Sequence, residues 1–282
     1  MSQSTVAGRI RAGMGGWNYE PWRKTFYPKQ VSKNQELHYA SRQVTAIEIN
    51  GTFYRLQSPA VFAKWRDETP DDFVFSLKAP RFLVNRRDLR TAAEGLPRFI
   101  NSGLSQLQTK LGPLLWQLAP TKPFDAGEVD DFLGMLPAEV DGIPLRHALE
   151  VRHESFMTPE YLQIAREHRV ATVFADTDEH PSFADVTADF IYARLMRTVS
   201  TEPTGYARTA LATWAMRAGQ WHPARTRVAC RESRRSVART GCVTSSCSLS
   251  AERRNAHPLP RSTSSLCWTG GNGFSGHLVS VR

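Results

Sequence analysis

Short apolar segments with the pattern of β-strands alternate with helical segments along the first 221 residues of this chain, and this order restricts the fold more than any other feature. The strand segments are rich in β-branched, aromatic and other apolar residues. They are residues 9–13, 46–50, 73–77, 114–118, 148–152, 171–175 and 190–195. The connections have helical periodicity at residues 37–43, 59–68, 89–107, 128–136, 159–168 and 207–220. Within residues 89–107, Pro97 must bend or restart the helix. Strands that alternate with helices form parallel sheets with crossover helices, so the sequence predicts an α/β fold of the TIM-type (β/α) barrel class.

The pattern supplies seven strands, whereas a closed barrel of this type has eight strands and about 250 residues. No further strand is recognisable after Trp221. We therefore predict an incomplete barrel domain over residues 1–221, in which the last strand and helix are missing or replaced by an irregular tail, residues 222–282. Such an open barrel would leave the edges of the first and seventh strands unpaired, a feature that promotes aggregation.

The tail differs sharply in composition from the rest of the chain. Residues 1–222 carry 26 Lys and Arg against 25 Asp and Glu, whereas residues 223–282 carry 10 Arg, no Lys and 2 Glu. The net charge of +9 therefore resides mostly in the tail and does not indicate a nucleic-acid-binding surface on the body. The four cysteines also lie in the tail, and their spacing does not match the paired ligands of a zinc site. They are Cys230, Cys242, Cys247 and Cys267.

The Ser- and Cys-rich segment at residues 244–249 suggests that the tail is read out of frame. Ser codons beginning with TC, Cys codons and Leu codons beginning with TT all start with T. A frame that begins one base earlier places this T in the middle of the codon, and a middle T always encodes an apolar residue. The shifted reading of residues 243–268 then has the pattern of a buried strand, a turn and an apolar helix. We predict a frameshift within codons 222–242 and a disordered tail; a natural disordered basic tail is the alternative.

Polar residues gather at the C-terminal ends of the predicted strands, where parallel barrels carry their active sites. Glu48, Glu150 and Asp176 are the candidate catalytic residues, either as general acid and base or as oxygen ligands of a divalent metal. The lysine and arginines nearby suit a phosphate or carboxylate group. The candidate substrate-binding residues are Asn50, Tyr54, Lys78, Gln117, Arg152, Tyr192, Arg194 and Trp17.

These residues also have structural interpretations. A buried Glu150 would pair with a cation inside the barrel, while the other strand ends would be solvated. Trp17 belongs to an aromatic cluster around the first loop that either stacks a ligand ring or packs over the barrel mouth. Asp176, Asp178 and His180 resemble metal ligands, but no second histidine lies at helical spacing. The sequence therefore leaves any metal or other cofactor unspecified.

Several motifs follow one another in a fixed order from about Ile10 to Trp221. They are Gly16-Trp17-x-Tyr19-x-x-Trp22, Glu48-Ile-Asn50-Gly-Thr52-Phe53-Tyr54, Phe73-x-Phe75-x-x-Lys78, Leu111-Gly-Pro113-Leu-Leu-Trp-Gln117, Glu150-Val-Arg152-His153, Asp176 and Tyr192-x-Arg194. In these motifs the chain resembles the domain of unknown function 72 family, also called YecE-like proteins. The resemblance implies a TIM-type barrel with polar strand ends and no established activity. Histidines that family members often carry after the lysine and after the Tyr-x-Arg motif are absent here, where Phe82–Asn85 and Leu195–Met196 stand.

From these observations we expect a hydrolase or lyase that acts on a small polar, anionic substrate at the C-terminal strand ends. A nucleic-acid-binding or ligand-binding protein without catalysis is the alternative, although the nearly neutral body disfavours strong binding to phosphate backbones. An inactive, frameshifted remnant is the third hypothesis. No segment approaches the roughly 18 apolar residues of a membrane span, and the N-terminus lacks a secretory signal pattern, so we expect a cytoplasmic protein without a membrane partner. The sequence specifies no oligomeric state.

Overall fold

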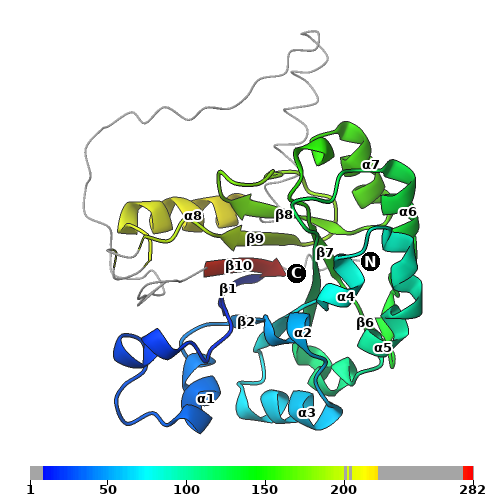
Figure 1. The fold of residues 1–282 in the computed structure, drawn as a ribbon. Coiled ribbons are helices and arrows are strands. Elements are labelled where there is room, and N and C mark those ends of the chain that lie inside the picture. The colour runs from blue at the N-terminus through cyan, green and yellow to red at the C-terminus, as the bar shows by residue number, and fades with distance from the viewer. Residues whose placement is uncertain (1–8, 200–201, 203–204, 222–275, 282) are drawn as a thin grey trace, which may run out of the picture.

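A curled sheet of parallel strands forms the centre of the protein (Figure 1). The computed structural model describes residues 9–199, 202, 205–221 and 276–281. Within these residues, seven strands lie parallel to their neighbours in the sheet. They are β1 (Arg9–Gly15), β2 (Ala46–Ile49), β3 (Val74–Lys78), β4 (Leu111–Gln117), β7 (His147–Glu150), β8 (Ala171–Asp176) and β9 (Ile191–Leu195). Every strand predicted from the sequence is thus present, with ends shifted by no more than three residues.

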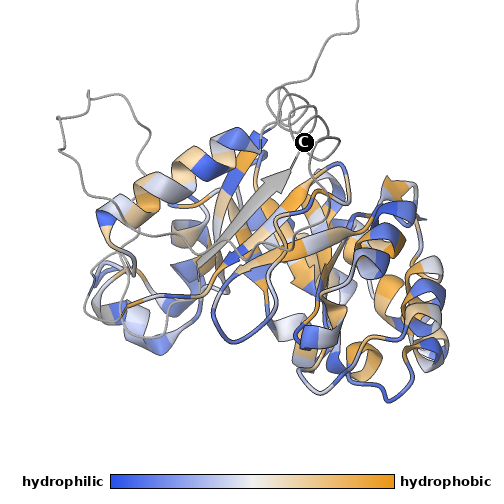
Figure 2. Ribbon diagram, turned by 90° about the horizontal axis from the view of Figure 1, so that it is seen from above, coloured by the Kyte–Doolittle hydropathy of each residue, from blue (hydrophilic) through white to orange (hydrophobic). Residues whose placement is uncertain are grey.

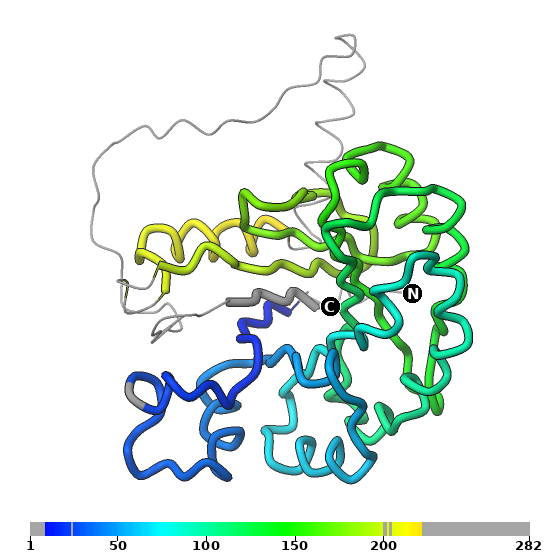
Figure 3. The backbone as a smooth tube through the Cα atoms, in the orientation of Figure 1, coloured from blue at the N-terminus to red at the C-terminus, as the bar shows by residue number. Residues whose placement is uncertain are grey.

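The helices cover the outer face of this sheet (Figure 1). The α-helices are α1 (Glu36–Ala40), α2 (Gly51–Tyr54), α3 (Pro59–Glu68), α4 (Arg81–Val84), α5 (Leu96–Ile100), α6 (Ala126–Gly134), α7 (Pro159–Glu167) and α8 (Arg208–Gln220). The 3₁₀ helices are η1 (Glu20–Lys24), η2 (Lys33–Gln35), η3 (Leu89–Glu94), η4 (Leu104–Lys110) and η5 (Glu154–Phe156). The trace in Figure 3 runs once around the sheet from β1 to α8, so that strands close in sequence are also neighbours in the sheet.

The helical segment predicted over residues 89–107, in which Pro97 was expected to bend or restart the helix, is divided into three short helices. Pro97 lies in the first turn of α5, where its missing N–H is tolerated, and η3 ends just before it. Gly103 precedes η4 with a φ of 110°, a conformation that side chains with a Cβ rarely adopt. A proline and a left-handed glycine therefore break the helical pattern that the apolar periodicity predicts.

A short hairpin between α6 and β7 was not predicted. It consists of β5 (Glu139–Val140) and β6 (Ile143–Pro144), which pair antiparallel. Asp141 and Gly142 connect them with φ angles of 48° and 74°. Positive φ at both central residues is the requirement of the tight hairpin turn that Asp-Gly favours, so this dipeptide was the signal that sequence analysis missed.

The edges of β1 and β9 are not open. β10 (Gly276–Val281) pairs antiparallel with both, and the strand order is β1-β10-β9-β8-β7-β4-β3-β2. The expectation of unpaired edges and of a tail without a strand is therefore wrong for residues 276–281. Edge strands present unpaired N–H and C=O groups, which an extended segment of adequate length can satisfy whatever its direction. The segment in which we predicted the frameshift lies outside the described residues.

Apolar layers lie on both faces of the sheet. The inner layer consists of residues that are at most 5% exposed, namely Leu115, Ala148, Ala171, Val173, Phe190 and Tyr192. The outer layer lies between sheet and helices and contains most of the large aromatic side chains, including Phe62, Phe75, Phe99, Trp116, Phe132 and Phe156. Figure 2 shows hydrophobic residues concentrated on the strands and hydrophilic residues towards the outer loops. In the described part of the chain, no helix is both long and apolar enough to span a membrane.

Candidate functional site

Five strands place polar side chains on the inner face of the sheet at its C-terminal edge. Successive residues of a strand point to opposite faces, so residues two apart share a face. The register aligns Gly15 of β1 with Glu48 of β2, Gln117 of β4 with Glu150 of β7, and Ala175 of β8 with Arg194 of β9. The members of this polar layer are Glu48, Lys78, Gln117, Glu150 and Arg194. Gly15 and Ala175 add almost no side-chain volume to it.

Arg194 joins two glutamates from opposite sides of the ring. Its Nη1 donates to Oε2 of Glu150 at 2.6 Å, and its Nη2 donates to Oε1 of Glu48 at 3.2 Å. The three side chains are 6%, 2% and 0% exposed for Arg194, Glu150 and Glu48. Residues 146 positions apart in the chain thus form a buried network, and the guanidinium lies between the two carboxylates.

Further hydrogen bonds fix Glu150. Gln117 Nε2 donates to its Oε2 at 2.9 Å, and Arg152 Nε donates to its Oε1 at 2.8 Å. Burial by itself would raise the pKa of Glu150, but the charges of Arg194 and Arg152 and these hydrogen bonds outweigh burial and lower the pKa to about 2. Glu150 is therefore ionised at neutral pH and is a weak base.

Tyr192 and Ser76 extend the network towards the inner apolar layer. The Tyr192 hydroxyl donates to Glu48 Oε2 at 2.7 Å and lies 2.8 Å from the Ser76 hydroxyl, which donates to the Pro113 carbonyl at 2.9 Å. Burial and the Glu48 charge raise the pKa of Tyr192 well above its usual value, so the phenol keeps its proton. Sequence analysis did not name Ser76, although it shares a face of β3 with Lys78 two residues later.

Lys78 lies beside this network without joining it. Its Nζ is 4.4 Å from the centre of the Phe53 ring, and in the described part of the chain it donates no hydrogen bond and forms no ion pair. Burial and the nearby charge of Arg194 lower the pKa of Lys78 to about 8, although Glu48 and Glu150 oppose the shift. The half-buried amine thus remains available to a ligand, and a substantial fraction of it is neutral at slightly alkaline pH.

Comparison with known proteins identifies the family. The family model described as "Protein of unknown function DUF72" matches residues 11–241. This chain belongs to the DUF72 family. The resemblance drawn from the sequence motifs is thereby confirmed.

The curated relatives and solved structures agree with this assignment. UPF0759 protein YecE of Escherichia coli K12 is 30% identical over 148 residues, which are 52% of this chain and 50% of the relative. UPF0759 protein YunF of Bacillus subtilis is 24% identical over 160 residues, which are 55% and 54% of the two chains. The chain thus spans about half the length of the curated relatives it matches.

Solved structures of DUF72 proteins share the fold. The crystal structure of a DUF72 protein from Thermotoga maritima superimposes with a TM-score of 0.56 and 21% identity, covering 74% of this chain and 86% of that one. A DUF72 protein from Enterococcus faecalis gives a TM-score of 0.51 and 16% identity, covering 67% and 82%. Together with the sheet described above, these likenesses show an α/β fold built on a curled parallel sheet.

In this DUF72 chain, Asp176 belongs to a second polar cluster. It accepts a hydrogen bond from the Tyr206 hydroxyl at 2.8 Å and lies 3.3 Å from Arg197 Nε, and Arg197 also pairs with Asp178. The same Tyr206 hydroxyl accepts the backbone N–H of Arg197 at 2.8 Å. The structure shows no contact of Asp176 with Glu48 or Glu150. Tyr206 and Arg197 follow the last parallel strand at irregular spacing, so no periodic signal marked them.

Three predicted binding residues of the DUF72 chain lie apart from the Arg194 network. Asn50 caps the short helix α2 without a side-chain hydrogen bond, and Tyr54 at the end of that helix is 72% exposed. Trp17 packs edge-on against Trp65, with ring centroids 5.3 Å apart. The backbone carbonyl of Trp17 accepts the Tyr27 hydroxyl.

The aromatic residues around the first loop mainly pack together. Trp22 and Tyr27 are 3% and 5% exposed, and Phe26 makes edge contacts with both, at 5.9 and 4.9 Å. Tyr19 remains 44% exposed. Of the two interpretations that the sequence left open, packing describes this cluster better than a free stacking platform.

The described residues contain no cluster of metal-ligating side chains that would support the metal interpretation of Asp176, Asp178 and His180. Within them, no group of three or more His, Cys, Asp or Glu side chains is arranged to hold an ion. His153 caps the 3₁₀ helix η5, since its Nδ1 accepts the backbone N–H of Ser155 at 3.2 Å and lies 2.7 Å from the hydroxyl of that serine. These contacts give His153 a local structural role.

Proposed function

We propose that this DUF72 chain is a hydrolase or lyase that acts on a small polar, anionic substrate at the C-terminal ends of the strands. The observation that carries the proposal is the position of Lys78, a half-buried amine beside four fixed charged groups that makes no hydrogen bond with the residues the structure describes. An amine left without an acceptor at the usual active-site edge of such a sheet is available for a ligand.

We assign Lys78 the role of proton acceptor. With a pKa of about 8, roughly a tenth of the amine is neutral at pH 7, and general bases act best when their pKa lies near the working pH. Glu150 is less suited, because its pKa is about 2 and both of its oxygens accept hydrogen bonds. The glutamates, expected from sequence to supply acid and base, then serve to hold Arg194 and Arg152 in place.

The charge balance supports an anionic substrate. With Lys78 protonated, as most of it is at pH 7, Lys78, Arg152 and Arg194 carry three positive charges against the two of Glu48 and Glu150; with Lys78 neutral, the form that accepts a proton, the charges balance. The side chain of Arg152 is 19% exposed, and its Nε and Nη2 both contact Oε1 of Glu150. Its other terminal nitrogen, Nη1, takes no part in these contacts. Buried Nε of Arg194 has no hydrogen-bond partner within the described residues. The partly exposed guanidinium of Arg152 thus retains a donor for a carboxylate or phosphate, whereas Nε of Arg194 is enclosed by protein atoms.

The test is a substrate panel on the purified full chain. The panel contains phosphate monoesters, small carboxylic esters and hydroxy acids, monitored by release of phosphate or acid and by ultraviolet absorbance of new double bonds. Lys78→Met should abolish any turnover found, and wild-type turnover should rise with pH through about 8. The matched control is Lys64→Met, because Lys64 is exposed and pairs with Glu68 at 3.5 Å. Turnover that survives Lys78→Met, or no turnover of any panel member, counts against the proposal.

Binding of the same anion without catalysis is the second candidate. It is favoured by the engagement of both carboxylates in the Arg194 network, which leaves Lys78 as the main reactive group. A saturable binding signal without turnover would select it. The packed first-loop aromatics support a small ligand over a nucleic acid, and salt-independent binding would argue further against nucleic acid.

The finer fold assignment and the reading frame also belong to the proposal. We propose that the sheet corresponds to a TIM-type barrel in which β10 occupies the place of the eighth parallel strand. An intact eighth unit would restore a parallel strand and a covering helix there. Sequencing the DNA across codons 215–245 tests the frameshift directly, and an in-frame result would refute it. Absence of all activity in this chain, with activity in a frame-corrected version, would identify an inactive remnant.

A further inference from the structure

A polar cleft lies beside the candidate site, between the chain segments that follow β3 and β4. Its volume is about 710 Å³, within the range of small-ligand pockets. One wall is formed by residues 84–87, at the end of α4, and the other by residues between 119 and 125 together with Glu128. Because β3 and β4 are neighbours in the sheet, the two walls of the cleft follow the strands that end at Lys78 and Gln117.

The acidic residues of the cleft are already satisfied. Glu128 forms an ion pair with Lys122, each side chain being 9% exposed, and it also accepts the backbone N–H of Leu89. Asp125 caps α6, its Oδ1 accepting the backbone N–H of Glu128 at 2.8 Å. The charge of Glu128 is compensated by Lys122, whereas Asp125 keeps its charge, so the cations that line the cleft outnumber its carboxylates by one.

Two arginines supply uncompensated positive charge. Nε of Arg86 donates to the Phe82 carbonyl at 2.5 Å, which orients the guanidinium and leaves both terminal nitrogens. The carbonyl of Arg87 accepts Nζ of Lys122 at 2.7 Å, so the buried lysine anchors the backbone at that position. Across the residues that the structure describes, neither guanidinium is paired with a carboxylate. Hydrogen bonds to backbone carbonyls therefore hold this segment in place, while the guanidinium groups of Arg86 and Arg87 form no ion pair within the described residues.

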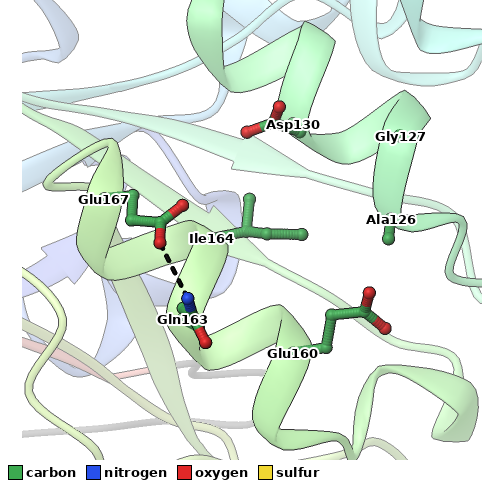
Figure 4. A pocket seen from close by; sticks show the side chains of 7 residues that line it. All are labelled: Ala126, Gly127, Asp130, Glu160, Gln163, Ile164 and Glu167. Atoms are coloured by element: carbon green, nitrogen blue, oxygen red, sulfur yellow. Dashed lines mark hydrogen bonds between the residues drawn. The ribbon is translucent and has the colours of Figure 1, made fainter.

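A second groove, between α6 and α7, is lined by acidic residues and is therefore unsuitable for an anion. The groove between α6 and α7 in Figure 4 is lined by Asp130, Glu160 and Glu167, with Gln163 hydrogen-bonded to Glu167 at 2.9 Å. Its acidic rim would repel an anion. The contrast in charge between the two hollows selects the cleft beside β3 and β4 for an anionic group.

We propose that this cleft binds a phosphoryl group of the substrate through Arg86 and Arg87. Guanidinium groups match phosphate oxygens with paired, charge-assisted hydrogen bonds, and two of them match the charge of a phosphate dianion. This proposal rests on the proposed function, because it makes the substrate a phosphorylated compound whose reacting end reaches the strand ends near Lys78. The substrate class of the proposed enzyme would then be small phosphorylated compounds.

The experiment titrates the full chain with inorganic phosphate by isothermal calorimetry. Arg86→Gln/Arg87→Gln is expected to weaken phosphate binding by about 10- to 100-fold, the effect of losing charge-assisted hydrogen bonds. Arg90→Gln is the matched control, because Arg90 lies on the adjacent η3, is 53% exposed and already pairs with Asp88 and Asp131. It should leave the affinity within about 2-fold. Arg86→Lys, which keeps the charge and loses the planar fork, should give an intermediate affinity.

Distinct outcomes separate the cleft from the strand-end site. Loss of phosphate binding in Lys78→Met but not in Arg86→Gln/Arg87→Gln would place the anion at the strand ends; the cleft proposal would then fail while the proposed function stands. Equal weakening by Arg90→Gln, or no phosphate binding by the wild-type chain, overturns the cleft proposal as well. Circular dichroism melts of each variant separate lost binding from lost folding, and a folded variant with wild-type affinity refutes the assignment.

Discussion

Replacing Arg194 by methionine tests the electrostatic reasoning behind the site. The substitution keeps much of the side-chain volume and removes the guanidinium that contacts both Glu48 and Glu150 at 3.2 and 2.6 Å. Arg152 and Gln117 still contact Glu150 in the variant. The change therefore isolates the contribution of one buried cation.

Two independent arguments give the size of the effect. Removing one partner of a buried ion pair costs about 3–5 kcal/mol, because the remaining charge stays buried. The lowering of the Glu150 pKa from 4.5 to about 2 on folding corresponds to about 3 kcal/mol of stability, to which Arg152 and Gln117 contribute together with Arg194. A pKa lowered by folding contributes stability above the unfolded pKa and loses it as pH falls towards the folded one. We therefore expect Arg194→Met to lose about 3 kcal/mol at pH 7 and a smaller amount at pH 3, where part of the carboxylate stabilisation is already lost.

Urea denaturation followed by tryptophan fluorescence at pH 7 and pH 3 measures both values. Arg197→Met is the control, because Arg197 is also paired with two carboxylates but is 51% exposed, and exposed pairs contribute about 1 kcal/mol or less. A loss below about 1 kcal/mol at pH 7, or a loss that is the same at both pH values, would refute the argument that Arg194 compensates buried charge.

Three further substitutions have defined outcomes. Lys78→Met should raise the free energy of unfolding by about 3 kcal/mol at pH 7, because folding lowers the lysine pKa from 10.5 to about 8 and so opposes the charged form; this gain should shrink to below about 1 kcal/mol at pH 10, and a pH-independent gain would contradict the cause. Tyr192→Phe should cost about 1–3 kcal/mol in urea melts, because Glu48 and Ser76 lose a buried hydroxyl, and a neutral effect would mean that these groups find other partners. Thr158→Ala should cost about 1 kcal/mol in thermal melts through loss of the cap of α7, whereas Thr158→Ser should retain most of the stability.

The sequence predicted the strands well and the interruptions poorly. A buried strand such as residues 171–176 is recognisable from its own apolar run, because strand formation at such a site depends on a few adjacent residues. In residues 89–107 the restart at Pro97 was expected from the residue type, whereas the second break, at Gly103, was not, because a periodic pattern does not contain the effect of a left-handed glycine. The direction of β10 could not be predicted at all, since it depends on which edges of the sheet remain unpaired.

The candidate site was predicted as a set of residue types and not as a network. Position at a strand end selected Glu48, Lys78, Glu150 and Arg194, and the curled sheet brings all four to one edge. Asp176 met the same criterion and lies in a different cluster, because its neighbour in space is the segment after β9. The position of a residue at a strand end thus predicts the edge of the sheet at which its side chain lies. It does not predict which other side chains that residue contacts.

What the sequence determined by itself is the order of strands and helices and the edge at which polar groups gather, because periodicity and side-chain alternation are local properties of the chain. The tertiary structure alone decided which charges meet, which carboxylates are neutralised and which amine is left without an acceptor. Glu48 and Arg194 are separated by 146 positions, and their pairing, together with the burial that shifts the neighbouring pKa values, exists only once the sheet has curled and excluded water.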